Sequence, residues 1–354
     1  MAYIYKFPAV KGIQAGREYY ISMVSLNLLE KLFPADEDLV LPEYRAQRKI
    51  NESRIPEIRD YILNNKKNYV FSALSASIDG EFKFISKDES DVGVLEIDMN
   101  AKFLINDGQH RKAAIEAAIK EDESLSNETI SIVFFKDDGL ARSQQMFTDL
   151  NKHAVKSSNS LSTLYDSRDE IAVATKEIIN EIPFLKKYTD KERDILGINS
   201  SKLLTLNTIY KANQKILHSN KCTEEDKKFI FEFWKNVSTN VVEWNDLINR
   251  NLSKRDLREN YIITLSVTIN SLGRLGRYLY DNRSINLKDT LKKLETIDWS
   301  RNSDYWLGRT IRENGKVINS EEAAMLTCSQ IKLLIGLDLT KEELQKEKNM
   351  KRSK

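Results

Sequence analysis

The sequence predicts an α+β fold, with an N-terminal α/β domain over residues 1–162 followed by a mainly α-helical domain over residues 163–354. Two observations predict this division. Short runs with β character alternate with amphipathic helical stretches before residue 162, and helical periodicity dominates after it. A chain of 354 residues is also longer than one typical domain, and it is long enough to bury two sizeable cores.

Six runs in the first half have the apolar, β-branched or aromatic character of strands. They span residues 18–24, 69–79, 81–85, 93–98, 103–107 and 129–135. Asp79-Gly80 predicts a tight turn, so we expect the run that ends there to form a hairpin with the run that follows. Apolar residues at helical spacing predict helices at residues 26–33, 52–63, 111–119 and 141–151.

Helical patterns fill most of the second half. They span residues 171–181, 202–217, 224–244, 257–279, 287–294 and 320–336. Trp234 and Trp244 are expected in the core of this domain rather than on a base-stacking surface. The tail from Lys341 to Lys354 carries six basic and three acidic residues, and we expect it to fray.

Composition excludes several classes of protein. The 55 basic residues nearly balance the 53 acidic ones, so any nucleic-acid-binding face must be local. Cys222 and Cys328 lie far apart in the chain, which argues against a disulfide framework and against a zinc site; no metal site is predicted. The chain does not begin like a signal peptide and has no apolar run that could span a bilayer, so we expect a cytoplasmic protein without membrane contact.

The stretch from Phe103 to Ile115 is the strongest functional signal. It predicts a strand, a tight turn at Asp107-Gly108, and a helix. The first turn of such a helix has unpaired N–H groups that favour anions, phosphates above all, and Gly108 lets a ligand come close. Asp107, Gln109, His110 and Arg111 lie at this turn. The alternative is that Asp107 only caps the helix and Arg111 lies in solvent.

A second polar group follows the helix predicted at residues 141–151. Asn151 either ends this helix or contacts a ligand. For His153, which lies beyond it, we favour a structural role. Upstream, Arg48 and Arg54 either keep a helix face solvated or point toward the turn and bind phosphate, a task that suits the planar guanidinium. Gly108, His110, Arg111, Arg48, Arg54 and Asn151 are therefore the candidate phosphate-binding residues.

The string Asp107-Gly108-Gln109-His110-Arg111 resembles the DGQHR signature of the DndB family of DNA sulfur modification proteins. The block from Gln144 to Val155, followed by Ser160-Leu161, is similar to the second motif of that family. Residues 47–58 also resemble its opening half. More distantly, the turn is similar to the core of ParB-like domains, where the equivalent turn lies beside a nucleotide or DNA phosphate.

A local excess of cations between Arg250 and Arg283 is the best candidate for DNA backbone contact in the helical half. Such contacts give affinity without sequence specificity. The alternative is a solvated helix hairpin. The candidate DNA-binding residues are Arg250, Lys254, Arg255, Arg258, Arg274 and Arg277.

The resemblance implies a DNA-binding regulatory component of the DNA phosphorothioation system, which acts on transcription of the modification genes. Its partners would be double-stranded DNA and other DNA sulfur modification proteins. Whether the chain also forms a homo-oligomer stays open. The chain has no P-loop pattern and no cysteine cluster for iron–sulfur chemistry, which supports a non-catalytic role.

Two other functions stay open. The first is a nucleotide hydrolase or DNA nickase that uses Mg²⁺ and a nucleoside triphosphate or DNA phosphate. In it, Asp107 would hold the metal or act as base, Gln109 would orient water, His110 would be the acid/base and Arg111 would stabilise phosphoryl charge. The second is a scaffold for other modification proteins, built on the helical half.

Overall fold

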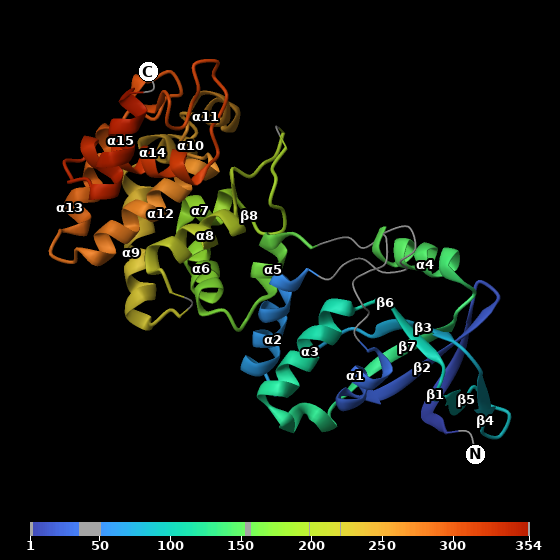
Figure 1. Cartoon of the computed structure of the whole chain (residues 1–354). Helices are drawn as coiled ribbons and strands as arrows, with labels where there is room; N and C mark the ends of the chain where they lie inside the picture. Colours follow the sequence, from blue (N-terminus) through green and yellow to red (C-terminus); the bar gives the residue numbers. More distant parts are fainter. Residues whose placement is uncertain (1–2, 35–50, 153–156, 198, 220, 353–354) are drawn as a thin grey trace. The chain divides into compact units, whose positions relative to one another are not determined.

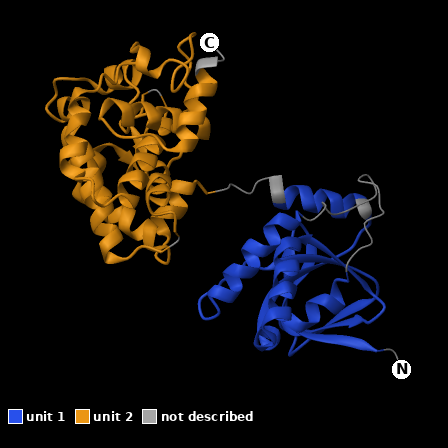
Figure 2. Cartoon of the chain, turned by 60° about the vertical axis from the view of Figure 1, so that its left-hand side comes forward, with its two compact units in different colours: residues 1–155 blue, residues 156–354 orange. Residues whose placement is uncertain are grey.

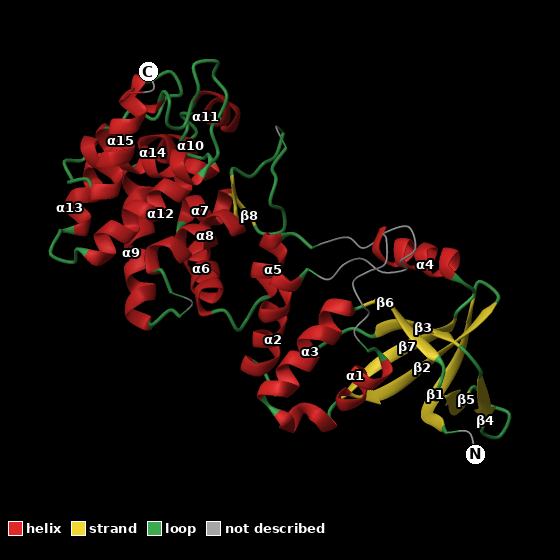
Figure 3. Ribbon diagram, viewed as in Figure 1, coloured by secondary structure: helices red, strands yellow, loops and turns green. Residues whose placement is uncertain are grey.

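A computed structural model describes residues 3–34, 51–152, 157–197, 199–219 and 221–352 of the chain. They form two compact units, residues 1–155 and residues 156–354 (Figure 2). The first unit combines a sheet with helices and the second is built mainly of helices, which confirms the α+β fold class (Figure 3). The expected boundary after residue 162 falls inside helix α5 (Asn159–Tyr165) of the second unit.

The first unit contains a seven-stranded sheet in the order β4-β5-β1-β2-β7-β3-β6 (Figure 1). All neighbouring strands are antiparallel except β3 and β7, which are parallel. The strands are β1 (Ile4–Gln14), β2 (Arg17–Ser25), β3 (Leu74–Asp79), β4 (Phe82–Ser86), β5 (Val92–Asp98), β6 (Lys102–Asp107) and β7 (Thr129–Lys136).

One face of the sheet is covered by helices α1 (Leu29–Leu32), α2 (Ile55–Asn64) and α3 (Gln109–Glu121). Alternate strand residues point toward these helices, as the period of two in a pleated strand requires. Phe7, Tyr20 and Leu95 contribute to this core from the sheet, and Ile62 and Ile115 contribute from the helices. The predicted apolar faces of α1 and α3 are therefore confirmed, whereas on α2 only Ile62 of the predicted face is fully buried.

Two strand predictions were wrong. The run at 81–85 does not pair with the run before it, because β4 pairs with β5, while β3 pairs with β6 and β7. Strand β3 also begins at Leu74 rather than at residue 69. The apolar pattern fixes that these runs are strands, but the choice of partner depends on which side chains share the helix-covered face.

Strand β1 has no counterpart among the predicted strands, because Pro8 and Gly12 weaken its strand signal. The structure accommodates Pro8 at the point where pairing with β2 stops. Residues from Ala9 onward pair with β2, whereas Pro8 lies opposite Val94 of β5 only. The hydroxyl of Ser22 donates to the Pro8 carbonyl oxygen at 2.8 Å, which satisfies that backbone group.

The second unit is a cluster of helices around one large core. Its longer helices are α6 (Glu170–Glu181), α8 (Leu206–Leu217), α9 (Glu224–Asn240), α12 (Ser266–Asp281), α14 (Glu321–Leu334) and α15 (Lys341–Arg352). Helix α12 packs closely on α8, because Gly273 and Gly276 face Ala212 and Ile216 and leave no room for a Cβ atom. Trp234 and Trp244 are fully buried, as predicted.

Two helix predictions needed correction. The run at 224–244 is interrupted at Val241, whose extended backbone separates α9 from α10 (Val242–Ile248). The run at 257–279 divides into α11 (Lys254–Asn260) and α12. Within the described residues, the C-terminal tail contains helix α15, which forms two ion pairs with the rest of the unit, Lys332–Glu343 and Arg309–Glu347, each with an N···O distance of 2.6 Å.

Candidate functional site

The turn between β6 and α3 has the strand–turn–helix form that the sequence predicts. Strand β6 ends at Asp107, Gly108 adopts a left-handed conformation with φ of 104°, and α3 begins at Gln109, two residues earlier than expected. A Cβ atom at position 108 would lie 2.4 Å from Cδ2 of Leu74. Both the backbone and its surroundings therefore require glycine here.

Arg111 is bound to the protein and does not lie in solvent. Its Nη1 donates to the carbonyl oxygens of Ser72 (2.6 Å) and Ala73 (2.9 Å) and to the Ser72 hydroxyl (2.7 Å). Its Nη2 pairs with Oδ2 of Asp107 at 2.5 Å. Asp107 does not cap the helix, since the N-cap residue is Gly108 and no side chain caps it. The guanidinium thus anchors the chain segment that leads into β3.

His110 connects α3 to the start of the preceding helical segment. Its Nε2 accepts a hydrogen bond of 2.9 Å from the backbone N–H of Asn51, the residue that caps the short helix Glu52–Arg54. His110 in this arrangement positions the segment that enters α2.

Two buried amides beside the turn have a nitrogen without a hydrogen-bond partner among the described residues. They are Nδ2 of Asn106 and Nε2 of Gln109. Asn106 is fully buried and its Oδ1 accepts from the hydroxyl of Ser77 at 2.9 Å. It is the bulged residue of β6, because Ser75 and Ala76 of β3 pair with Asp107 and Ile105. Bulges often occur next to functional sites.

The second sequence motif lies on helix α4 (Leu140–Lys152), which packs beside β6. Ser143 and Met146 form its buried side, and Asp149 accepts from the amide of Gln145. The two motifs therefore belong to neighbouring elements of one unit. Asn151 is the last residue but one of this helix.

The contacts of the described residues do not bring Arg54 to the turn. Arg54 is exposed, and its side chain makes no ion pair or hydrogen bond within the described part of the chain. Arg48 and His153 lie outside the described residues. Asn106, Asn51 and Ser72 are the residues that the sequence interpretation missed. Only Asn106 has a sequence signal, a polar residue directly after the apolar run that ends at Ile105.

The six candidate DNA-binding cations do not form one patch. Arg258 donates from Nη2 to the carbonyl oxygens of Ser200 (3.0 Å) and Lys202 (2.7 Å), just before α8. Arg277 donates from Nη1 to the carbonyl oxygen of Leu217 (2.8 Å), at the end of α8. A helix of 12 residues is about 18 Å long, so these two guanidinium groups lie well apart.

The other four cations divide into paired and exposed groups. Arg274 shares the carboxylate of Glu321 with Lys215, at 2.9 and 2.8 Å. Arg250, Lys254 and Arg255 are exposed around the start of α11, and Arg255 has one ion pair, with Glu259 on the same helix. These three residues are the accessible part of the predicted set.

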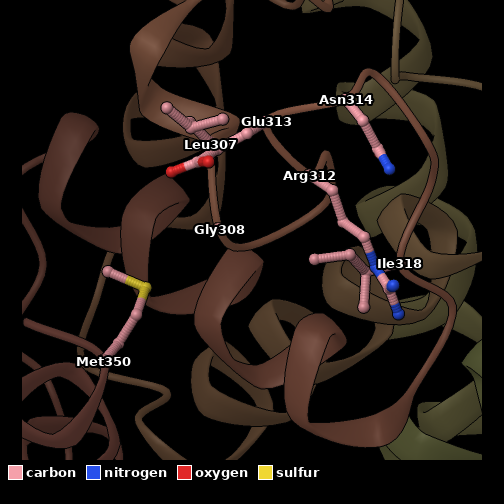
Figure 4. A pocket seen from close by; sticks show the side chains of 7 residues that line it. All are labelled: Leu307, Gly308, Arg312, Glu313, Asn314, Ile318 and Met350. Atoms are coloured by element: carbon pink, nitrogen blue, oxygen red, sulfur yellow. The ribbon is translucent and has the colours of Figure 1, made fainter. Parts of the chain in front are cut away.

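The second unit also contains a hollow of about 480 Å³ between the loop at 307–318 and α15 (Figure 4). Leu307, Ile318 and Met350 line it together with the polar side chains of Arg312, Glu313 and Asn314. The sequence patterns do not indicate this hollow, because its walls come from distant segments. The DGQHR turn belongs to the other unit.

No thiol in the described residues is activated. Burial raises the pKa of Cys328 to about 12 and that of Cys222 to about 11, so both stay protonated at neutral pH.

Among the described residues, no group of three or more His, Cys, Asp or Glu side chains is arranged to hold a metal ion. No helix of the described chain is both long and apolar enough to cross a membrane.

Comparison with protein families gave a match over most of the chain. The family described as DndB, DNA-sulfur modification-associated, matches residues 7–338 of the 354. The match includes the DGQHR turn, helix α4 and most of the helical unit. Neither a curated protein nor a solved structure matched the chain.

Proposed function

Since this chain belongs to the DndB family of DNA-sulfur modification-associated proteins, we propose that it is a DNA-binding regulator of the DNA phosphorothioation system. In this role it binds double-stranded DNA and controls transcription of the modification genes, and it does not install sulfur itself. Family membership supports the link to DNA sulfur modification, and the geometry of the turn supports the non-catalytic role.

The observation that favours a regulator over an enzyme is the internal pairing of the turn. Asp107 would be the base or metal ligand of an enzyme, but its carboxylate is paired with Arg111. Arg111 would stabilise phosphoryl charge, but its Nη1 donates to Ser72 and Ala73. Groups held in this way act first as structural links, and using them on a substrate would break contacts that hold β3 and α3 together.

The proposed DNA contact is the exposed group of Arg250, Lys254 and Arg255. Exposed cations can approach phosphate oxygens without first losing a buried partner, whereas Arg277 would have to leave a helix C-terminus. Binding of this kind supplies affinity, whereas base recognition requires other residues.

A second candidate function is binding of a phosphate group by the turn. It is favoured by the two buried amide nitrogens of Asn106 and Gln109, which lack partners in the described structure and lie on either side of Gly108. Buried donors without partners are costly, and an oxyanion or an ordered water would satisfy them. The same position is the N-terminus of α3, where N–H groups favour anions.

The test combines DNA binding with a search for chemistry. Labelled duplexes from the promoter region of the modification genes, and scrambled duplexes of equal length, are titrated with the full-length protein over a salt series. Nicking and phosphate release are followed with ATP or CTP and Mg²⁺. Tight, sequence-selective, salt-sensitive binding without nicking or release supports the regulator. Nicking or release that is lost in His110→Ala overturns it in favour of an enzyme.

Charge-removal variants locate the DNA contact. Replacing Arg250, Lys254 and Arg255 together by Gln should reduce the slope of log K against log salt by up to about 3, because each lost phosphate contact removes about 0.9. The matched variant Arg274→Gln with Arg277→Gln should leave the slope near its original value, since both residues are engaged within the protein. The opposite pattern would move the DNA contact to α12.

A further inference from the structure

The sheet of the first unit has a second face, opposite to the one that α1, α2 and α3 cover. We propose that this face is the interface of a symmetric homodimer in which the sheets of two copies pack against each other. The strand register, the exposure of side chains and the charge of this face support such a dimer independently of the proposed regulatory function.

The register of the strands places apolar side chains side by side on this face. In one row across the sheet, Val92 of β5 lies opposite Val10 of β1, which lies opposite Ile21 of β2, which lies opposite Val133 of β7. In the neighbouring row, Ile85 of β4 and Pro8 of β1 both lie opposite Val94 of β5. Met23 continues this face on β2, two residues beyond Ile21.

These side chains are accessible although they are apolar. Met23 is 62% exposed, Val92 55% and Val10 49%. The solvent face of an antiparallel sheet normally carries polar residues in alternation with the core face. Large contiguous apolar patches on a protein surface usually mark interaction sites.

The charged side chains at the margin of the patch offset one another in part, because one carboxylate lies between two ammonium groups and leaves a net charge of +1 per copy. Glu96 lies opposite both Lys6 and Lys83 in the register and forms ion pairs with them at 2.7 and 3.1 Å. The carboxylate is nearly buried between the two ammonium groups. When two copies of the face pack together, their charged rows therefore repel each other only weakly. The net charge of the whole chain is also only +2.

At the opposite margin, the rings of Tyr19 and Phe135 stack with centroids 5.9 Å apart. Beyond them, helix α4 packs beside β6 and occupies the far end of the sheet. Within the described part of this unit, this face is accessible over β4, β5, β1, β2 and β7, with a polar row at one margin and helix α4 beside β6 at the other.

The area of the face fits a second copy of the chain. Five strands about 4.8 Å apart and four rows about 6.8 Å apart cover roughly 24 by 27 Å, or about 650 Å². Specific interfaces bury about 600 to 1,000 Å² on each partner. Two sheets that pack face to face do so with their strands about 30° apart and with interleaved apolar side chains, and a patch with an apolar centre is complementary to itself.

The first experiment measures the mass of the full-length protein in solution by sedimentation over a concentration series. A dimer of two 41.0 kDa chains is expected. Val10→Lys and Met23→Lys place a charge in the centre of the face, so each should raise the dimer dissociation constant at least about tenfold. Val70→Lys is the matched control, because Val70 is 76% exposed and lies outside the strands, and it should leave the dimer intact.

A second measurement on the unmutated protein keeps the proposal testable even if a variant folds poorly. The ¹³C-methyl resonance of Met23 should shift between dilute and concentrated samples, whereas that of Met350 in the other unit should not. A monomer at all concentrations, or a dimer that both face variants leave unchanged, would overturn the proposal. A complex formed only with another modification protein would also overturn it and would assign the face to that partner.

Discussion

The guanidinium of Arg111 is paired with the carboxylate of Asp107, four residues before it, with Nη2 2.5 Å from Oδ2. The other terminal nitrogen of Arg111 donates to backbone oxygens of Ser72 and Ala73. One side chain therefore joins the end of β6, the first turn of α3 and the approach to β3. In the structure, Asp107 and Arg111 of the signature join these three segments through their own contacts.

Replacing Arg111 by Ala should destabilise the first unit. The variant loses several charge-assisted hydrogen bonds and leaves two backbone oxygens without this donor, so we expect a loss of about 2 to 3 kcal/mol. Urea unfolding measures it, with Arg255→Ala at the surface as the control that should change stability by less than about 0.5 kcal/mol. If Arg111→Ala keeps its stability but loses DNA or nucleotide binding, the turn is a binding site instead.

Gly108→Ala should cost more stability than Gly139→Ala, although both glycines have a positive φ, 104° and 99°. Each substitution pays for an unfavourable backbone conformation, about 1 kcal/mol. At position 108 the new methyl group would also meet Cδ2 of the buried Leu74, whereas at position 139 no atom lies within 4 Å. Thermal unfolding of both variants checks this. Equal losses would mean that Leu74 moves aside without cost.

Glu243 should make the second unit less stable as the pH rises. Its burial, with smaller contributions from Asp246 and Asp298, raises the pKa of its carboxyl from 4.5 to about 7. The folded protein thus holds this proton more tightly than the unfolded chain. The contribution is complete below about pH 4.5 and is lost as the pH rises through about 7.

Glu243→Gln removes this dependence, so at pH 8 the variant should be more stable than the unmodified protein by about 2 kcal/mol, after allowance for its partial exposure. The two proteins should have similar stability at pH 4.5. Melting temperatures at several pH values provide the measurement, and Glu295→Gln, at an exposed position, should follow the unmodified protein. Parallel curves for all three proteins would exclude Glu243 as the source.

The ion pair between Lys332 and Glu343 should matter far more for α15 than the exposed pair between Lys346 and Glu322. Lys332 is fully buried, with its Nζ 3.6 Å from the ring centre of Tyr278. Glu343→Gln leaves this ammonium group without its charged partner and should cost about 3 kcal/mol. Lys346→Met should cost less than about 1 kcal/mol.

A double variant, Lys332→Met with Glu343→Gln, should recover much of that loss, because it removes the buried charge itself. Urea unfolding of the single and double variants gives the coupling between the two residues. Strictly additive losses would show that Lys332 and Glu343 are not coupled and that this ion pair does not stabilise α15.

The local structure of the functional turn could be predicted because it depends on neighbouring residues. An apolar run sets the strand, Gly108 permits the left-handed conformation, and the Ala-rich stretch after it forms a helix. The same reasoning predicted the buried helix faces and the two buried tryptophans. Its failures in local structure were at Val241, where an apolar residue carries no sign that a helix will stop, and at Pro8, which suggested no strand.

What the sequence by itself determined is therefore the order and type of most elements, the membership of a DNA sulfur modification family and the place of the DGQHR turn. The tertiary structure decided which groups meet. It alone pairs β4 with β5, brings Arg111 to Ser72 and Ala73, and separates Arg258 from Arg277 by the length of α8. The physical reason is that propensity acts over a few residues, whereas these contacts join segments that are distant in the chain and are selected by burial and by the need to satisfy buried polar groups.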